Sequence, residues 1–86
     1  MTSCLPAYHV TADLRAAGHT DSTRGRAWRP GFRAHQASPR TVRLWHDGPD
    51  EQHHLDQYAK ELRRLGYYVT AEHPSGKRPR IRVTHP

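Results

Sequence analysis

Five residues in the second half of the chain have the chemistry of a nucleic-acid-binding surface. They fall at alternating positions of three strand-like segments, and they are Arg43, Trp45, Tyr68, Arg80 and Arg82. Alternate residues of a strand point to the same side of a sheet. Aromatic rings offer flat surfaces on which unpaired bases stack, and guanidinium groups neutralise the neighbouring phosphates. The pattern therefore predicts a small, basic, non-catalytic accessory protein that binds single-stranded or structured nucleic acid.

The same five residues also fit a different function. Trp45 and Tyr68 can be buried beneath the first 40 residues or in a dimer, with the arginines as a solvated rim. A protein-interaction or homodimerisation module that uses this face or a free sheet edge is therefore the alternative hypothesis. The arrangement is similar in principle to open-sheet RNA-binding modules, but the aromatic and glycine pattern of the RNA-recognition motif is absent.

A second set of side chains is predicted to meet at one edge of the sheet: His46, Asp47, Asp50 and His73. The two histidines end parallel strands, and the carboxyl ends of parallel strands are where open sheets place ligand sites. Two imidazoles with a carboxylate can bind a divalent metal or transfer protons. No His-x-x-x-His or catalytic spacing is present, and both aspartates also suit helix capping. A metal-dependent enzyme is therefore a distant third hypothesis, and the sequence indicates no catalytic residue, metal ligand or cofactor.

Two shorter motifs predict no site. His53 and His54 are adjacent on a predicted helix, so their side chains point about 100° apart and are expected to face solvent. The segment Gly76-Lys77-Arg78 lacks the remaining positions of a phosphate-binding loop, and its glycine suits an ordinary hairpin turn.

The elements that must position these residues lie between residues 41 and 86. Residues 41–46 alternate between apolar and polar, which predicts a strand. Residues from about 49 to 65 predict a helix, because one apolar stripe recurs at spacings of three and four: Leu55, Tyr58, Ala59, Leu62 and Leu65. Asp47 or Gly48 is the expected N-cap, and Gly66 is the expected stop. Residues 67–73 and 79–84 predict two further strands joined by a turn.

Together these elements predict an α+β fold, a single small βαββ domain over residues 41–86. One helix would cover one face of a three-stranded sheet. The strand–helix–strand unit is expected to be parallel and right-handed, and the turn sends the last strand back antiparallel. Two strand orders stay open, with the last strand at the centre or at the edge. In either order the face opposite the helix has no cover within residues 41–86.

Residues 1–40 are predicted to be a flexible, Arg-rich N-terminal arm that is largely disordered. Only Val10, Leu14 and Ala17 have helical spacing, and a helix of two turns is marginal by itself. Trp28 and Phe32 are isolated aromatics among polar residues. A segment of this composition buries too little apolar surface to offset the conformational entropy lost on ordering. Three roles stay open for the arm: a passive extension, an electrostatic tail that binds phosphate, or a segment pinned to the domain by its two aromatics.

The overall composition limits the class of protein. Eighty-six residues suffice for one domain, and the formal net charge of +6 favours an anionic partner. Twelve of the 14 basic residues are arginine, which suits phosphate contacts but is also what an Arg-biased genomic composition would produce. Cys4 is the only cysteine, so an internal disulfide and multi-cysteine zinc sites are excluded. No apolar run approaches the length of a membrane helix, and no signal-peptide core is present; a cytoplasmic location is expected.

Overall fold

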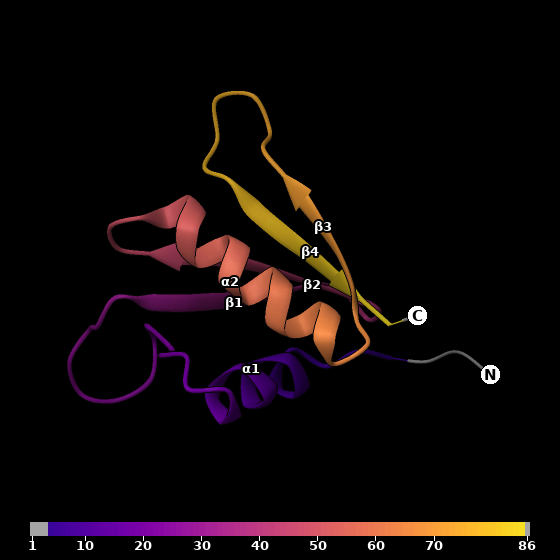
Figure 1. Cartoon of the computed structure of the whole chain (residues 1–86), viewed down its shortest axis with the longest axis horizontal. Helices are drawn as coiled ribbons and strands as arrows, with labels where there is room; N and C mark the ends of the chain where they lie inside the picture. Colours follow the sequence, from indigo (N-terminus) through magenta and orange to yellow (C-terminus); the bar gives the residue numbers. More distant parts are fainter. Residues whose placement is uncertain (1–3, 86) are drawn as a thin grey trace.

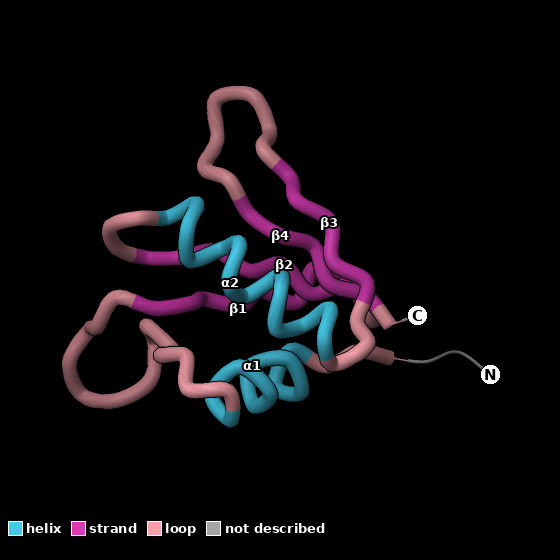
Figure 2. Tube along the Cα trace, in the orientation of Figure 1, coloured by secondary structure: helices cyan, strands magenta, loops and turns pink. Residues whose placement is uncertain are grey.

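A four-stranded antiparallel sheet with two helices forms the structure of this small α+β protein. The computed structural model describes residues 4–85. The elements follow the order α1 (Ala7–Ala16), β1 (Gly31–Ser38), β2 (Thr41–Asp47), α2 (Glu51–Arg64), β3 (Tyr68–Glu72) and β4 (Arg80–Thr84). The strand order is β1-β2-β4-β3. Helix α2 crosses one face of the sheet and α1 lies beside it, along β1 (Figures 1 and 2).

The strands predicted in residues 41–84 are present, and the sheet order is now fixed. Val42 and Leu44 are fully buried, and the intervening Arg43 and Trp45 point to the other face. Strand β4 pairs antiparallel with both β2 and β3. Strands β2 and β3 therefore run in the same direction, as expected, but β4 lies between them. The last strand is central rather than at the edge.

Helix α2 has the predicted buried stripe but different ends. Leu55, Tyr58, Ala59 and Leu62 are buried, whereas Leu65, the C-cap residue, is 45% exposed. The N-cap is Asp50, so the prediction of Asp47 or Gly48 was wrong. Asp50 adopts the left-handed conformation with φ of 58°, and its side chain makes no capping hydrogen bond. Gly66 ends the helix with φ of 100°, where glycine avoids the steric cost of a side chain.

The prediction of a disordered arm is wrong for residues 4–40. These residues contain helix α1 and strand β1, and β1 extends the sheet beyond β2. Four of their side chains are fully buried in the same core as those of α2: Leu5, Val10, Leu14 and Phe32. Neither element is expected to be stable alone, but both gain burial by packing against the predicted domain. The fold is therefore βαββ extended by an additional αβ unit, with a fourth strand and a second helix.

Specific polar contacts attach the N-terminal residues to the remainder of the chain. The Leu5 amide donates to the Pro39 carbonyl at 2.8 Å. The Gln36 side chain accepts from the Ala7 amide at 2.6 Å and donates to the Leu5 carbonyl at 2.8 Å. The Tyr67 hydroxyl donates to the Asp13 carboxylate, and burial together with this bond raises the pKa of Tyr67 to about 12. These contacts define where α1 sits on the core.

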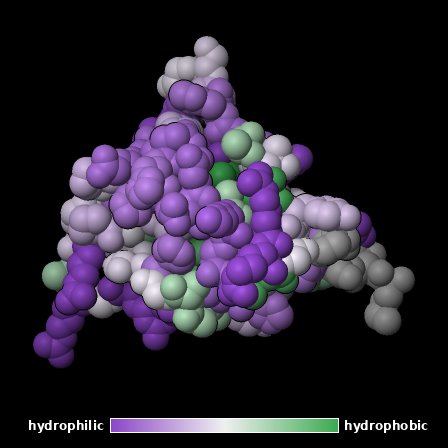
Figure 3. All heavy atoms as spheres, viewed as in Figure 1, coloured by the Kyte–Doolittle hydropathy of each residue, from purple (hydrophilic) through white to green (hydrophobic). Residues whose placement is uncertain are grey.

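The surface on the helix side is mainly hydrophilic, with smaller hydrophobic patches (Figure 3). Within residues 4–85, no helix combines the length and the apolar character needed to cross a membrane. The opposite surface is the outer face of the sheet, which the two helices leave uncovered.

Candidate nucleic-acid interface

The uncovered surface of the sheet, here called the open face, is built from alternate residues of all four strands. Cross-strand partners lie on the same face, and the register pairs Arg33 with Trp45, His35 with Arg43, and Arg43 with Arg82. The same face continues across β4 to β3, where Arg80 pairs with Glu72 and Arg82 with Thr70. Strand β1 thus adds Arg33 and His35 to the surface, and the sequence did not predict either because residues 1–40 were expected to be disordered.

All five residues of the predicted binding surface lie on the open face, but their accessibility differs. Tyr68 is 63% exposed, and Arg82 is exposed. Arg43 and Trp45 are half-buried between neighbouring strands. The Arg80 side chain is only 16% exposed. The register expected for β2 is confirmed because the indole of residue 45 lies on the side away from α2. The proposed contact with nucleic acid itself stays a prediction.

Two carboxylates neutralise much of the positive charge on the open face. Glu72 Oε1 lies 2.9 Å from Arg80 Nε and 3.6 Å from Arg43 Nε. Asp47 lies 3.0 Å from Arg33 Nε and 3.2 Å from Arg78 Nη1. Arg82 makes no ion pair with any residue that the structure describes. Arg82 and Tyr68 are therefore the two predicted contact residues that are free to meet a ligand without breaking an existing contact.

The Asp47 carboxylate is held in its charged form. Burial would raise its pKa, but hydrogen bonds from Ser22 Oγ and Arg33 Nε, and the charge of Arg33, outweigh burial and lower the pKa of Asp47 below its ordinary value. Asp47 therefore links β1, β2 and the segment preceding β1. Because its carboxylate accepts hydrogen bonds from these donors, it does not act as the predicted helix cap.

One side of the Trp45 ring is occupied by another open-face residue. The Arg33 guanidinium carbon lies 5.2 Å from the centre of the indole, a cation–π contact. His35 approaches the indole edge-on, with the ring centres 6.2 Å apart. A base can stack on that side of Trp45 only if Arg33 moves. Tyr68 is the more accessible stacking surface, whereas Trp45 serves better as a spectroscopic probe of the face.

The predicted cluster of His46, Asp47, Asp50 and His73 does not form. His46 is buried on the helix side of the sheet, whereas Asp47 points to the open face. His73 follows β3, which β4 separates from β2. The prediction failed because it treated the ends of the strands that carry His46 and His73 as neighbours on one surface. Among residues 4–85, no three His, Cys, Asp or Glu side chains are placed to bind a metal ion.

His46 instead belongs to an aromatic cluster beneath α2. Its Nδ1 is hydrogen-bonded to the Tyr58 hydroxyl at 2.7 Å, and its ring stacks on His54 with centres 4.0 Å apart. His19 packs edge-on against Tyr58, with 5.1 Å between ring centres. His54 is therefore half-buried and not fully solvent-exposed as expected, although His53 is exposed. These four rings border a cavity of about 170 Å³.

The buried His46 and the half-buried His19 predict a loss of stability in mild acid. Burial, and secondarily His54, lowers the pKa of His46 from 6.5; burial lowers the pKa of His19 against the opposing effect of Glu61. Because the unfolded chain binds these protons more readily, the free energy of unfolding should decrease as pH falls below about 6.5. The decrease should end once pH passes the lowered pKa values of the folded state. Urea unfolding followed by circular dichroism between pH 5 and 7.5 measures it.

Two variants assign this pH dependence. His46→Gln removes the titrating ring but keeps a side chain that can bond to Tyr58, so the decrease between pH 7.5 and 5 should become smaller. His53→Gln, on the exposed side of α2, should retain the full decrease. Equal pH profiles for His46→Gln and the unsubstituted protein would contradict the assignment to His46.

Comparison with known proteins finds no matching family model, and no significant match among the curated proteins or the solved structures. We therefore infer a function from the geometry and charge of the described residues.

Proposed function

We propose that the protein is a cytoplasmic, non-catalytic accessory protein that binds single-stranded or structured nucleic acid on its open face. The observation that supports the proposal is an uncovered sheet surface with arginines on β1, β2 and β4 and with an aromatic ring on β2 and another on β3. Guanidinium groups and accessible aromatic rings on one surface are the combination that non-specific single-strand binding uses. The net charge of +6 adds long-range attraction for a polyanion.

The residues of the open face have different roles in this proposal. Tyr68 offers its exposed ring to a base, and Arg82 offers a free guanidinium to a phosphate. Arg43 and Arg80 are shared with Glu72, so a phosphate near them competes with an existing carboxylate. The Arg43 Nε is buried without a hydrogen-bond partner among the described residues, so it can donate to a phosphate oxygen only if the side chain moves toward solvent. Trp45 contributes the ring side that Arg33 does not cover.

Replacing Tyr68 by alanine is expected to weaken binding to a single-stranded oligonucleotide. Stacking of one base on an aromatic side chain contributes about 1–3 kcal/mol, so the dissociation constant should rise about 5- to 150-fold. Fluorescence anisotropy with a labelled single-stranded octanucleotide, in both DNA and RNA form, measures the change. The same titration in a Trp28→Phe background should alter the emission of Trp45, which is then the only tryptophan.

The chain offers matched controls for both contact residues. Tyr8→Ala removes an equally exposed tyrosine, 67% accessible, from α1 on the other side of the molecule, and should leave binding unchanged. Arg82→Gln should reduce the salt dependence of log affinity by about 0.7 if Arg82 contacts one phosphate of a single strand. Lys60→Gln, on α2, should not reduce it. Equal effects of Tyr68→Ala and Tyr8→Ala would remove the open face from the binding site.

The competing function is a homodimer or a protein-interaction module. It is favoured by the outer side of β3, which has no strand partner among residues 4–85 and which carries the exposed Tyr68. An edge strand of this kind can pair with a second chain. Sedimentation velocity separates the two functions, because a stable dimer that is disrupted by Tyr68→Ala favours interaction between protein chains.

A further inference from the structure

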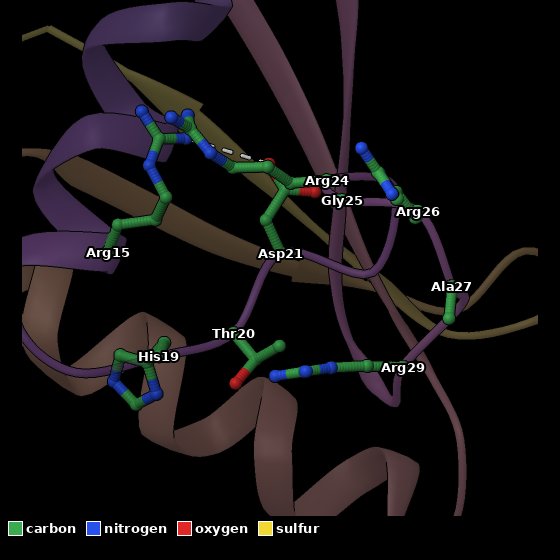
Figure 4. A pocket seen from close by; sticks show the side chains of 9 residues that line it. All are labelled: Arg15, His19, Thr20, Asp21, Arg24, Gly25, Arg26, Ala27 and Arg29. Carbon is green, nitrogen blue, oxygen red and sulfur yellow. Dashed lines mark ion pairs between the residues drawn. The ribbon is translucent and has the colours of Figure 1, made fainter.

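A second basic surface lies in the segment between α1 and β1. A cavity of about 520 Å³ is lined by four arginines together with one aspartate and one threonine: Arg15, Arg24, Arg26, Arg29, Asp21 and Thr20. Arg15 comes from the last turn of α1, and the others lie on the connection that follows it (Figure 4). In this view the Arg29 side chain extends toward Thr20, and Arg15 is directed toward Asp21. We call this cavity the arginine pocket.

The arginine pocket has a large excess of positive charge. Its lining holds four guanidinium groups and a single carboxylate, that of Asp21. That carboxylate is already engaged by the Thr23 amide at 3.0 Å and the Thr23 hydroxyl at 2.8 Å, and its other oxygen lies 3.6 Å from Arg15 Nη1. Arg24, Arg26 and Arg29 are exposed, and within residues 4–85 their side chains make no ion pair or hydrogen bond. Such charges repel one another unless an anion lies between them.

The backbone of the pocket is held in place at both ends. The Phe32 amide donates to the Thr20 carbonyl at 2.8 Å, and the Ser22 amide donates to the Phe32 carbonyl at 2.9 Å. The buried Ser22 hydroxyl donates to Asp47 at 2.9 Å. These bonds close the connection against the beginning of β1. Because Asp47 belongs to the open face, they also bring the arginine pocket next to the Gly31 end of that face.

The charge and size of the pocket select the class of ligand. Guanidinium groups bind phosphate oxygens through paired hydrogen bonds. A phosphate monoester carries a charge of about −1.5 to −2 near neutral pH, whereas an internal phosphodiester carries one negative charge. Four guanidiniums with one carboxylate therefore favour the monoester. A cavity of about 520 Å³ is within the size range of small-molecule sites, and it leaves room for the nucleoside that carries the phosphate.

We propose that the arginine pocket binds the terminal phosphate monoester of a nucleic-acid strand, together with the nucleotide that carries it. This inference rests on the proposed function and extends it, because it assigns the strand end to the pocket and the body of the strand to the open face. Arg24 and Arg29 bind the phosphate oxygens, and Arg15, already beside Asp21, contributes the charge of its guanidinium. Thr20 lies where its hydroxyl can bond to the phosphate or the sugar.

The test compares three single-stranded octanucleotides of one sequence, with hydroxyls at both ends, with a 5′-phosphate, or with a 3′-phosphate. One of the two phosphorylated strands should bind at least about tenfold more tightly than the hydroxyl strand, since hydrogen bonds to charged groups are strong. The double variant Arg24→Gln/Arg29→Gln should abolish this preference. The control Lys60→Gln/Lys77→Gln removes the same charge from exposed positions outside both surfaces and should weaken all three strands equally. Isothermal titration calorimetry supplies the constants.

The outcomes separate this inference from the proposed function. If octanucleotides bind through Tyr68 but neither terminal phosphate raises the affinity, the pocket assignment is overturned and the open face stands. The same conclusion follows if the preference for a phosphorylated strand survives in Arg24→Gln/Arg29→Gln. A different outcome is that no octanucleotide binds but a 5′- or 3′-mononucleotide does, and that Arg24→Gln/Arg29→Gln no longer binds the mononucleotide. The open-face function then fails, and the arginine pocket stands as a nucleotide site. In a Trp45→Phe background, the remaining Trp28 reports directly on the loop that forms the pocket.

Discussion

Replacing Phe32 by alanine is expected to destabilise the protein by about 3–5 kcal/mol, the usual cost of removing a buried phenyl ring. Phe32 is fully buried and packs edge-on against Tyr58, with 5.9 Å between ring centres. It also occupies the position where β1, α2 and the segment before β1 meet. For a domain of this size the loss is a large share of the total stability. Urea unfolding followed by circular dichroism at pH 7.5 measures it.

Trp28→Ala is the matched control for Phe32→Ala, since both positions hold isolated aromatics in the same polar stretch. Trp28 is 63% exposed, and surface substitutions usually change stability by less than about 0.5 kcal/mol. The contrast tests whether residues 4–40 belong to the folded domain. Two small effects of similar size would instead support the flexible arm that the sequence predicted.

Gly31→Ala is expected to destabilise the protein by about 1–3 kcal/mol and to open the arginine pocket. A Cβ at this position would overlap the Thr20 carbonyl oxygen and lie 2.8 Å from the Thr20 carbonyl carbon and 3.1 Å from the Ser22 amide nitrogen. All three are backbone atoms, so the contact cannot be relieved by rotating a side chain. The segment must therefore separate from β1. The Ser22 and Phe32 amides should then exchange hydrogen faster, and the increase should be larger than the loss of global stability accounts for.

Gly25→Ala provides the comparison within the same loop. Its Cβ would meet no atom within 4 Å, although its φ of 101° is costly for alanine. The strain is thus confined to the loop, and the Ser22 and Phe32 amides should keep their protection. If Gly31→Ala and Gly25→Ala had the same effect on these two amides, close packing at Gly31 would not be what holds the segment.

The two basic surfaces meet where Ser22 bonds to Asp47, which suggests how they act together. Asp47 pairs with Arg33 of β1 and with Arg78 of the connection between β3 and β4, and its hydrogen bond with Ser22 positions the loop that carries Arg24 and Arg29. In the proposed function, a strand extends along the open face and its phosphate end reaches the arginine pocket. A single carboxylate would then set the relative position of both parts of the interface.

The sequence of residues 41–84 was sufficient to predict local structure and side-chain faces. Strand β2 alternates strictly, α2 has one apolar stripe, and Gly66 ends that helix; each signal acts within a few residues. The five predicted contact residues therefore lie on the face expected of them. The α+β class and the uncovered sheet surface followed from the same local patterns.

The tertiary structure decided what depends on contacts between distant segments. Helix α1 and strand β1 have weak local signals, and they are ordered because Leu14 and Phe32 are buried against α2. Pairing with β4 placed β3 away from β2, which separated His73 from His46. Ion pairing to Glu72 and Asp47 determined which arginines are free. Burial and charge pairing depend on neighbours far along the chain, so local spacing alone could not assign them.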